Sequence, residues 1–368
     1  MRILMLADSV FATRERPLLA RLQIALGEEG VRVLLGVPEG TGALEGRDYV
    51  LRTIEIPRTG PFIGRTARLR PVFEALEPLR QGDGTPVDLV HAFGGGVWDL
   101  SMEASRRLEV PLALEIWRHG LTARALSVGT STTGPPVTLF APGAGIEREL
   151  TANAGHPPVR QTPWGAPIPA EPERHREDRV KSLFFVGTGR DVPSYIGAFE
   201  GLVRATASGP PTLIFADAEA ARRTGLWRAA RKLGVRDRLS LIGSLEASRE
   251  PVLSGDILIQ PEAHGEYRTL LIDAMAHGMA VVARRDPGIG YLVEGVTARL
   301  VGSARPTEWA EVIGSLVTEP EKASALGRSA RAHVAEHHRV GSHAQAVYNA
   351  YTWMTSADAV PISGRTGS

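Results

Sequence analysis

The fold of this chain is decided by one stretch, Glu262-Ala-His-Gly-Glu-Tyr-Arg-Thr-Leu-Leu-Ile-Asp-Ala-Met-Ala-His-Gly-Met-Ala-Val-Val-Ala283. A polar turn leads into an apolar segment, residues 270–276, which predicts a short helix that Gly278 ends. Residues 279–283 then predict a buried strand. Free N–H groups at a helix start attract phosphate, and a carboxylate such as Asp273, one turn inside the helix, accepts hydrogen bonds from ribose hydroxyls. The stretch therefore predicts a nucleotide-binding loop and helix.

Segments typical of strands and helices alternate along the rest of the chain, which indicates parallel sheets with crossover helices. We expect strands at 2–7, 31–37, 50–56, 87–92, 111–116, 137–141, 182–187, 212–216, 239–242 and 257–260. We expect helices at 17–29, 67–80, 100–108, 195–207, 218–233, 249–253, 309–317, 319–337 and 344–354. Residues 157–173 are rich in proline and turn residues, which predicts a linker between two domains.

Composition narrows the class of protein. A chain of 368 residues suits two domains, and 43% hydrophobic with 23% charged residues is typical of a soluble globular protein. A formal net charge of +1 gives no reason to expect nucleic-acid binding. The absence of cysteine excludes disulfides, thiolate catalysis and cysteine-ligated metals. No apolar run reaches the length of a membrane span and the N-terminus does not read as a signal peptide, so we expect a cytoplasmic protein.

The stretch at 262–283 resembles the donor-site motif of the retaining GT-B glycosyltransferases of group 1 (family 4), in which Glu-x7-Glu leads into Ala-Met-Ala-x-Gly-x-Pro-Val-Val-Ala. Further segments resemble that family in its own order, at 87–92, 112–120, 162–166, 182–187, 286–295 and 344–354. The resemblance implies an α/β fold of GT-B type, with two Rossmann-like domains whose parallel sheets face each other across a cleft. It implies an N-terminal acceptor domain at 1–165, a nucleotide-sugar domain at 175–340, a last helix at 344–355 that packs back on the first domain, and a flexible tail at 356–368.

By the same resemblance, we expect a hexosyltransferase of carbohydrate biosynthesis that needs no metal or other cofactor. It would move a sugar, with retention of configuration, from a nucleotide diphosphate sugar to a glycan, lipid-linked or small-molecule acceptor. The catalytic residues implied are His119 and Glu266. The residues implied for the donor nucleotide and phosphates are Gly187, Arg190, Gly265, Arg268, Thr269 and Asp273, and those on the acceptor side are His91 and Gly95.

The chain departs from the family pattern at both donor motifs. The second Glu of the pair falls on Asp273, the first falls on Gly265, and Glu266 stands one place late. In the loop after Gly187, the usual Arg is displaced to Arg190 and a proline replaces the Lys that follows. Arg190 and Arg268 either replace these cations at the diphosphate or only cap and solvate their loops.

Several alternatives stay open. His119 and His91 are either ligand-facing or structural histidines that the backbone satisfies. Residues 62–76 form either a contact with an anionic membrane, which would place the protein at the inner membrane face, or a helix that packs on its own sheet and solvates its arginines. The altered motifs also fit a non-catalytic relative that binds a sugar nucleotide or a partner enzyme. A sugar-nucleotide epimerase on the same fold is the remaining alternative.

Overall fold

The computed structural model describes residues 1–41, 50–57, 64–79, 85–129, 134–152, 154–170, 179–208, 211–243, 245–247 and 249–356. The chain divides into two compact units. Unit 1 comprises Met1–Trp164 and Val340–Ser368, and unit 2 comprises Gly165–Arg339. The predicted tail lies outside the described residues after Ser356.

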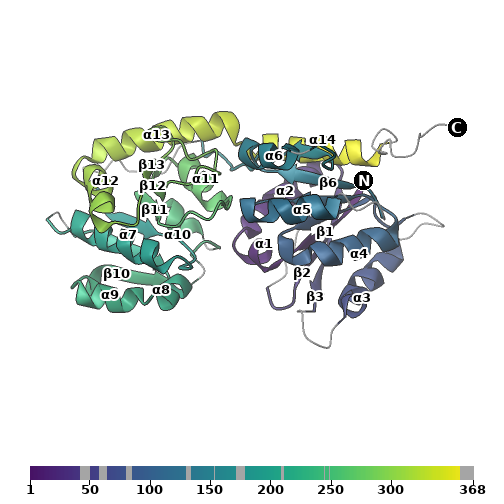
Figure 1. Ribbon diagram of the computed structural model, residues 1–368, viewed down its shortest axis with the longest axis horizontal. Helices are drawn as coiled ribbons and strands as arrows, with labels where there is room; N and C mark the ends of the chain where they lie inside the picture. The colour runs from purple at the N-terminus through teal and green to yellow at the C-terminus, as the bar shows by residue number, and fades with distance from the viewer. Residues whose placement is uncertain are drawn as a thin grey trace. The chain divides into compact units, whose positions relative to one another are not determined.

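Unit 1 is built on a seven-stranded parallel sheet with the strand order β3-β2-β1-β4-β5-β6-β7 (Figure 1). The strands are β1 (Arg2–Ala7), β2 (Arg32–Pro38), β3 (Val50–Ile56), β4 (Leu89–Phe93), β5 (Leu112–Glu115), β6 (Val137–Ala141) and β7 (Val159–Gln161). The helices are α1 (Ser9–Thr13), α2 (Arg16–Glu28), α3 (Arg65–Leu76), α4 (Trp98–Leu108), α5 (Thr122–Gly129), α6 (Ala144–Thr151) and α14 (Val340–Thr355), with short 3-10 turns η1 (Glu77–Leu79), η2 (Gly95–Val97) and η3 (His119–Leu121). Strands β1 and β4 are apolar and buried almost throughout because they lie at the centre of a sheet with covered faces.

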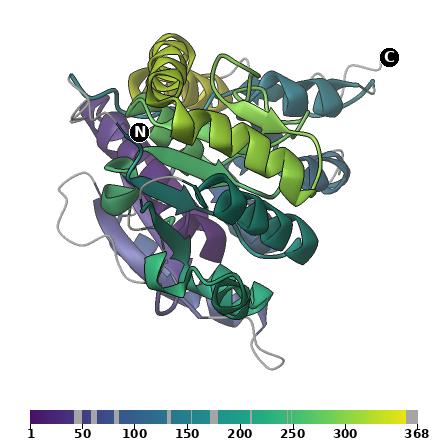
Figure 2. The same cartoon turned by 90° about the vertical axis from the view of Figure 1, so that its left-hand side faces the viewer.

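Unit 2 repeats this plan with six parallel strands in the order β10-β9-β8-β11-β12-β13. The strands are β8 (Ser182–Phe185), β9 (Leu213–Asp217), β10 (Leu239–Ile242), β11 (Ile257–Gln260), β12 (Ala280–Arg284) and β13 (Arg299–Val301). The helices are α7 (Val192–Ala205), α8 (Ala218–Thr224), α9 (Leu226–Lys232), α10 (Arg249–Leu253), α11 (Thr269–Ala276), α12 (Pro306–Thr318) and α13 (Pro320–His337), with the 3-10 turn η4 (Arg236–Arg238). Helices lie against this sheet on both faces (Figure 2).

Helices α7 and α12 pack closely on one face of the second sheet. A Cβ atom added at Gly201 would lie 2.4 Å from the Cβ of Trp309 and 2.6 Å from a carbonyl oxygen of α12. Only glycine therefore allows this approach. Phe185, Phe199 and Trp309 are fully buried beside this contact and form the centre of the core of unit 2.

The predicted class, two Rossmann-like α/β units with parallel sheets, is confirmed, and two local predictions are wrong. Residues 159–161 lie in the predicted linker but form β7, which pairs with β6; a three-residue strand after two prolines gives almost no periodic signal. The predicted helix at 218–233 is two helices, because Gly225 has a φ of +71° between α8 and α9. The strand β13 and the helices α1, α5 and α6 were not expected, since each is short.

Two predicted helices pack as their apolar residues require. Helix α14 lies against α2 and β4 and buries Val347 and Tyr351. Helix α3 buries Leu69 and Val72 and leaves Arg70 exposed beside Glu74, as expected for a helix that packs on its own sheet. Residues 62 and 63 of the predicted membrane segment lie outside the described residues. In the part of the chain that the structure describes, no helix combines the length and apolarity needed to cross a bilayer.

Candidate functional site

Both sheets reverse their strand order at one place, between β1 and β4 in unit 1 and between β8 and β11 in unit 2. Open α/β sheets bind ligands at the carboxyl ends of the strands next to such a reversal, because the loops there diverge and leave a crevice. The candidate site of unit 2 is therefore made by the loops at 186–191 and 261–268. That of unit 1 is made by the loops at 8–9 and 94–97.

In unit 2, the two crevice loops are joined by Glu262. Its carboxylate accepts hydrogen bonds from the backbone N–H groups of Thr188, Gly189 and Asp191, at 2.5, 3.0 and 2.9 Å. Gly187 precedes this cluster with a φ of +157°, and a Cβ there would lie 2.6 Å from a carboxylate oxygen of Glu262. The loop thus presents its N–H groups as an anion site, and a carboxylate of the same chain fills it.

These contacts keep Glu262 ionised. Burial opposes the charged form, but the His264 imidazole at 3.2 Å and the three N–H donors outweigh it and lower the pKa of Glu262 to about 2. The same contact raises the pKa of His264. Glu262 lies in the stretch that decides the fold, yet the sequence analysis gave it no role; its position directly after a buried strand at the sheet reversal was the available signal.

The crevice brings together four of the predicted donor-site and catalytic residues. Arg190 is half exposed and donates to Glu266 at 3.4 Å. Gly265 has a φ of +62° and donates its N–H to Asp286 at 2.7 Å. With Gly187, these residues line or border the space between the two loops.

Three other predicted donor residues lie behind the crevice, inside the protein. The guanidinium of Arg268 is buried and paired with Glu246 and Gln260. Asp273 is fully buried and paired with Arg249, which also donates to Thr269 at 2.7 Å. A salt bridge buried in this way needs both partners, because either charge alone would be left without compensation.

A narrow hollow lies over these buried pairs. It is lined by Gln260, Glu262, His264, Glu266, Arg268, Leu271, Asp286, Ile289, Tyr291 and Leu292. Its volume of about 20 Å³ has room for a single water-sized group. A nucleotide bound here would have to lie over the hollow or widen it.

In unit 1, the crevice is organised by Asp8. Its carboxylate caps α1 by accepting from Val10 N at 2.9 Å and also accepts from Gly96 N at 3.2 Å. Burial raises the pKa of Asp8. A groove of about 660 Å³ opens beside it, lined by Asp8, Ser9, Thr13, Pro38, Gly40, Thr41, Arg68, Gly96 and Val97. Gly95 lies next to this groove, and its carbonyl accepts from Arg124 at 2.8 Å.

The two predicted histidines of unit 1 differ in their surroundings. His91 is fully buried, with Nδ1 2.6 Å from the Tyr351 hydroxyl of α14, and burial lowers its pKa to about 3. It therefore has the structural environment that the sequence analysis kept as an alternative. His119 lies on η3 after β5, partly exposed, with Nδ1 2.6 Å from Glu149. Glu149 also accepts from Thr122 at 2.5 Å, so His119 is held by a carboxylate that the sequence analysis missed.

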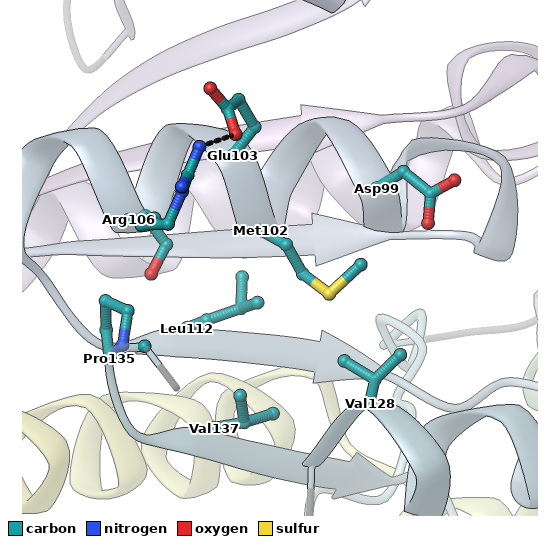
Figure 3. A pocket seen from close by; sticks show the side chains of 10 residues that line it. Asp99, Met102, Glu103, Arg106, Leu112, Val128, Pro135 and Val137 are labelled. Atoms are coloured by element: carbon teal, nitrogen blue, oxygen red, sulfur yellow. Dashed lines mark hydrogen bonds and ion pairs between the residues drawn. The ribbon is translucent and has the colours of Figure 1, made fainter. Parts of the chain in front are cut away.

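A second cavity of unit 1, of about 350 Å³, lies between α4, β5, β6 and the end of α5 (Figure 3). Met102, Leu112 and Val137 line it, and Glu103 at its rim is paired with Arg106. Its lining mixes apolar and charged side chains, and Asp99 at its rim is paired with Arg124. Among the residues that the structure describes, no three His, Asp or Glu side chains are grouped as a metal ion would require.

Part of the chain is similar to a known family of proteins. Residues 175–319 match the model of the glycosyl transferases group 1. D-inositol 3-phosphate glycosyltransferase of Corynebacterium jeikeium is 28% identical over 141 residues, which are 38% of this chain and 29% of that protein. The enzyme of the same name from Rhodococcus opacus is 30% identical over 116 residues, 31% of this chain and 26% of that protein. The matched part thus spans less than a third of either relative.

Solved structures resemble the whole chain. Sucrose-phosphate synthase from Thermosynechococcus elongatus superposes with a TM-score of 0.72 at 17% identity, over 96% of this chain and 99% of that one. Anabaena Alr3699/HepE in complex with UDP-glucose superposes with a TM-score of 0.68 at 18% identity, over 96% and 99%. The chain therefore has the GT-B fold, and its residues 175–319 are similar to the group 1 glycosyltransferases.

Proposed function

We propose that this protein transfers a hexosyl group from a nucleotide diphosphate sugar to an acceptor hydroxyl, with retention of the anomeric configuration. In that reaction the bond between the anomeric carbon and the diphosphate oxygen breaks, and a bond to the acceptor oxygen forms on the same face of the sugar. The acceptor loses its proton and the diphosphate leaves with added negative charge. A positive or hydrogen-bonding environment at the leaving group is then the main requirement on the protein.

The observation that carries this proposal is the crevice between the loops after β8 and β11, which lies inside the segment that matches group 1 glycosyltransferases. Neighbours of the same fold have been solved with UDP or UDP-glucose, which supports a uracil nucleotide as the first donor to test. Arg190 is the exposed cation of this crevice and Gly187 and Gly265 allow close approach of backbone, so we assign the diphosphate to these residues.

The other site residues keep the roles that the family resemblance implies. His119 and Glu266 are the proposed catalytic residues, with Glu149 as the positioning residue of His119. Arg268, Thr269 and Asp273 support the crevice from behind, through their buried pairs with Glu246 and Arg249. The proposed reaction uses no metal, so added EDTA should leave donor binding and turnover unchanged.

Thermal shift with nucleotides tests the donor site first. UDP, GDP, ADP and their sugar conjugates are added to the protein, and a ligand at a hundred times its dissociation constant stabilises the folded state by about 2.7 kcal/mol. Arg190→Ala should weaken the binding of the selected nucleotide about tenfold or more, since a charged hydrogen bond to phosphate is lost. The matched control is Arg299→Ala, which removes a half-exposed arginine paired with Glu294 on the edge strand β13.

Transfer is then measured with the selected sugar nucleotide, and the anomeric configuration of the product is read by NMR. His119→Gln should lower turnover without lowering the melting temperature, because the side chain lies at the surface of unit 1. An inverted product would overturn retention. The absence of any nucleotide effect would overturn the donor site.

One observation favours a second function, a non-catalytic relative that binds a sugar nucleotide or a partner enzyme. The N–H groups that the loop after β8 could offer to a donor phosphate are already bound to Glu262. For this function, nucleotide binding would persist with no transfer or hydrolysis. Conversely, turnover that is sensitive to His119→Gln would exclude it.

A further inference from the structure

We propose that unit 2 docks on an anionic membrane surface through the outer face of α9. This α9 face consists of Trp227, Arg228, Arg231, Lys232 and Leu233. Figure 1 shows α9 beside α8 and β10, the edge strand of the sheet. The proposal does not depend on the transferase activity.

The helix is divided cleanly between an inner and an outer side. Leu226 and Ala230, four residues apart, are fully buried in the core of unit 2. Trp227 and Arg228, which lie between them, turn outward, and Trp227 is 46% exposed. Leu233, at the C-terminal cap of the helix, is 37% exposed. Packing within unit 2 therefore explains the buried side of α9 but not the exposed Trp227 on its other side.

The α9 face carries three cations. Arg228, Arg231 and Lys232 are exposed, and no carboxylate of the described residues lies within 4 Å of any of them. In contrast, the neighbouring Arg223 is paired with Glu219 at 2.6 Å. Residues 222–238 hold seven Lys and Arg against one Asp, although the whole chain has a formal net charge of only +1. The positive charge of the chain is thus gathered around this helix.

This combination of side chains fits an anionic lipid surface. Tryptophan prefers the level of the headgroups, where its ring is in an apolar environment and its N–H stays hydrated. Cations around it meet the lipid phosphates, each contributing about 1 kcal/mol near a charged surface. A nucleic acid would also attract the cations, but it would leave the exposed Leu233 without an apolar contact. The α9 face therefore fits an anionic lipid surface better than a nucleic acid.

Vesicle co-sedimentation of the full chain tests the proposal. Vesicles of phosphatidylcholine mixed with phosphatidylglycerol should bind the protein at low salt, whereas phosphatidylcholine alone should not. The triple variant R228E/R231E/K232E should lose this binding, with a fall in the partition coefficient of about fivefold or more for each cation reversed. Its matched control is R52E/R148E/R328E, which reverses three exposed arginines on other elements and should retain wild-type binding.

Two further measurements test membrane binding even if the triple variant unfolds. Trp227→Phe should remove most of a blue shift of tryptophan emission on vesicle addition, since Trp98, Trp117, Trp164 and Trp309 are buried and Trp353 is only partly exposed. High salt should release the wild-type protein. Failure of the wild type to bind anionic vesicles would overturn the proposal, as would equal loss in the control variant. Binding of single-stranded RNA that depends on the same three cations, without vesicle binding, would replace the lipid by a nucleic acid.

Discussion

Glu262 receives the backbone N–H of Gly189 at 3.0 Å, and with it the loop after β11 holds the loop after β8. The two residues are 73 positions apart in the chain. This hydrogen bond is one of three that the Glu262 carboxylate accepts from backbone N–H groups, the others coming from Thr188 and Asp191. The geometry of the crevice between the loops after β8 and β11 therefore depends on one ionised side chain.

The first prediction concerns the charge of Glu262. The pKa is lowered from its ordinary 4.5 to about 2. The folded state thus holds the carboxylate ionised at pH values where the unfolded chain binds a proton. This stabilisation is fully present above pH 4.5 and is lost as the pH falls toward 2, amounting to about 3 kcal/mol. Glu262→Gln should remove this contribution to the free energy of unfolding. Urea unfolding at several values between about pH 3 and pH 7, a range that includes the ordinary pKa of a carboxylate, measures the loss.

The control is Glu219→Gln, which makes the same chemical change in an exposed ion pair with Arg223. It should alter the free energy of unfolding by less than about 1 kcal/mol. If Glu262→Gln behaved like this control, the carboxylate would not hold the two loops.

The second prediction concerns the buried pair of Arg249 and Asp273. Asp273→Ala should lower the free energy of unfolding by about 3–5 kcal/mol, because it leaves the guanidinium buried without its partner. The double variant Arg249→Met/Asp273→Leu should recover much of that loss, since two apolar side chains need no compensation. A double-mutant cycle by urea unfolding, completed with the single variants Arg249→Met and Asp273→Leu, measures the coupling, and additive losses would contradict it.

This pair also shows why the sequence predicted the fold better than the site. The strands at 2–7 and 257–260 were predicted because continuous apolar runs identify buried parallel strands without any long-range information. In contrast, nothing in local sequence shows that Asp273 meets Arg249 or that Glu262 meets the loop at 188–191. The family pattern pointed to the loops that border the crevice of unit 2, but the orientation of each polar side chain depends on tertiary packing.

Short elements leave little periodic signal in the sequence. The strand β7 has three residues and follows two prolines, so its composition is that of a linker. His119 could be identified from its motif, but its partner Glu149 lies on α6, a helix of eight residues that the periodicity did not reveal. Short elements are stabilised mainly by the packing around them, which local sequence does not record.

The third prediction concerns the buried acid of unit 1. Burial raises the pKa of Glu115 to about 8, although Trp164 donates to it at 2.7 Å. The folded state therefore binds a proton that the unfolded chain releases above pH 4.5. This contribution to stability is present below pH 4.5 and is lost as the pH rises to about 8, by about 1.4 kcal/mol for each pH unit. Glu115→Gln, which is neutral at every pH, should abolish this alkaline loss.

Urea midpoints of the wild type and Glu115→Gln at several pH values check this prediction. His91, 3.5 Å from Glu115, acts in the opposite direction because its lowered pKa costs stability only as the pH falls below 6.5. The two effects oppose each other between pH 4.5 and 6.5, so the contribution of Glu115 is read above pH 6.5. An alkaline limb unchanged in Glu115→Gln would show that the acid is ionised in the fold.

The last prediction concerns the break between α8 and α9, which orients the α9 face. Gly225 has a φ of +71°, and a Cβ added there would meet no atom within 4 Å. Gly225→Ala should therefore destabilise unit 2 through backbone strain alone, by about 1 kcal/mol, whereas Gly225→Asn should cost less because asparagine tolerates this conformation. Gly341→Ala is the control, since Gly341 lies in α14 with no positive φ and equally open surroundings, and alanine there should be neutral or slightly stabilising. Urea unfolding of the three variants measures the difference, and equal effects at both glycines would contradict the assigned strain.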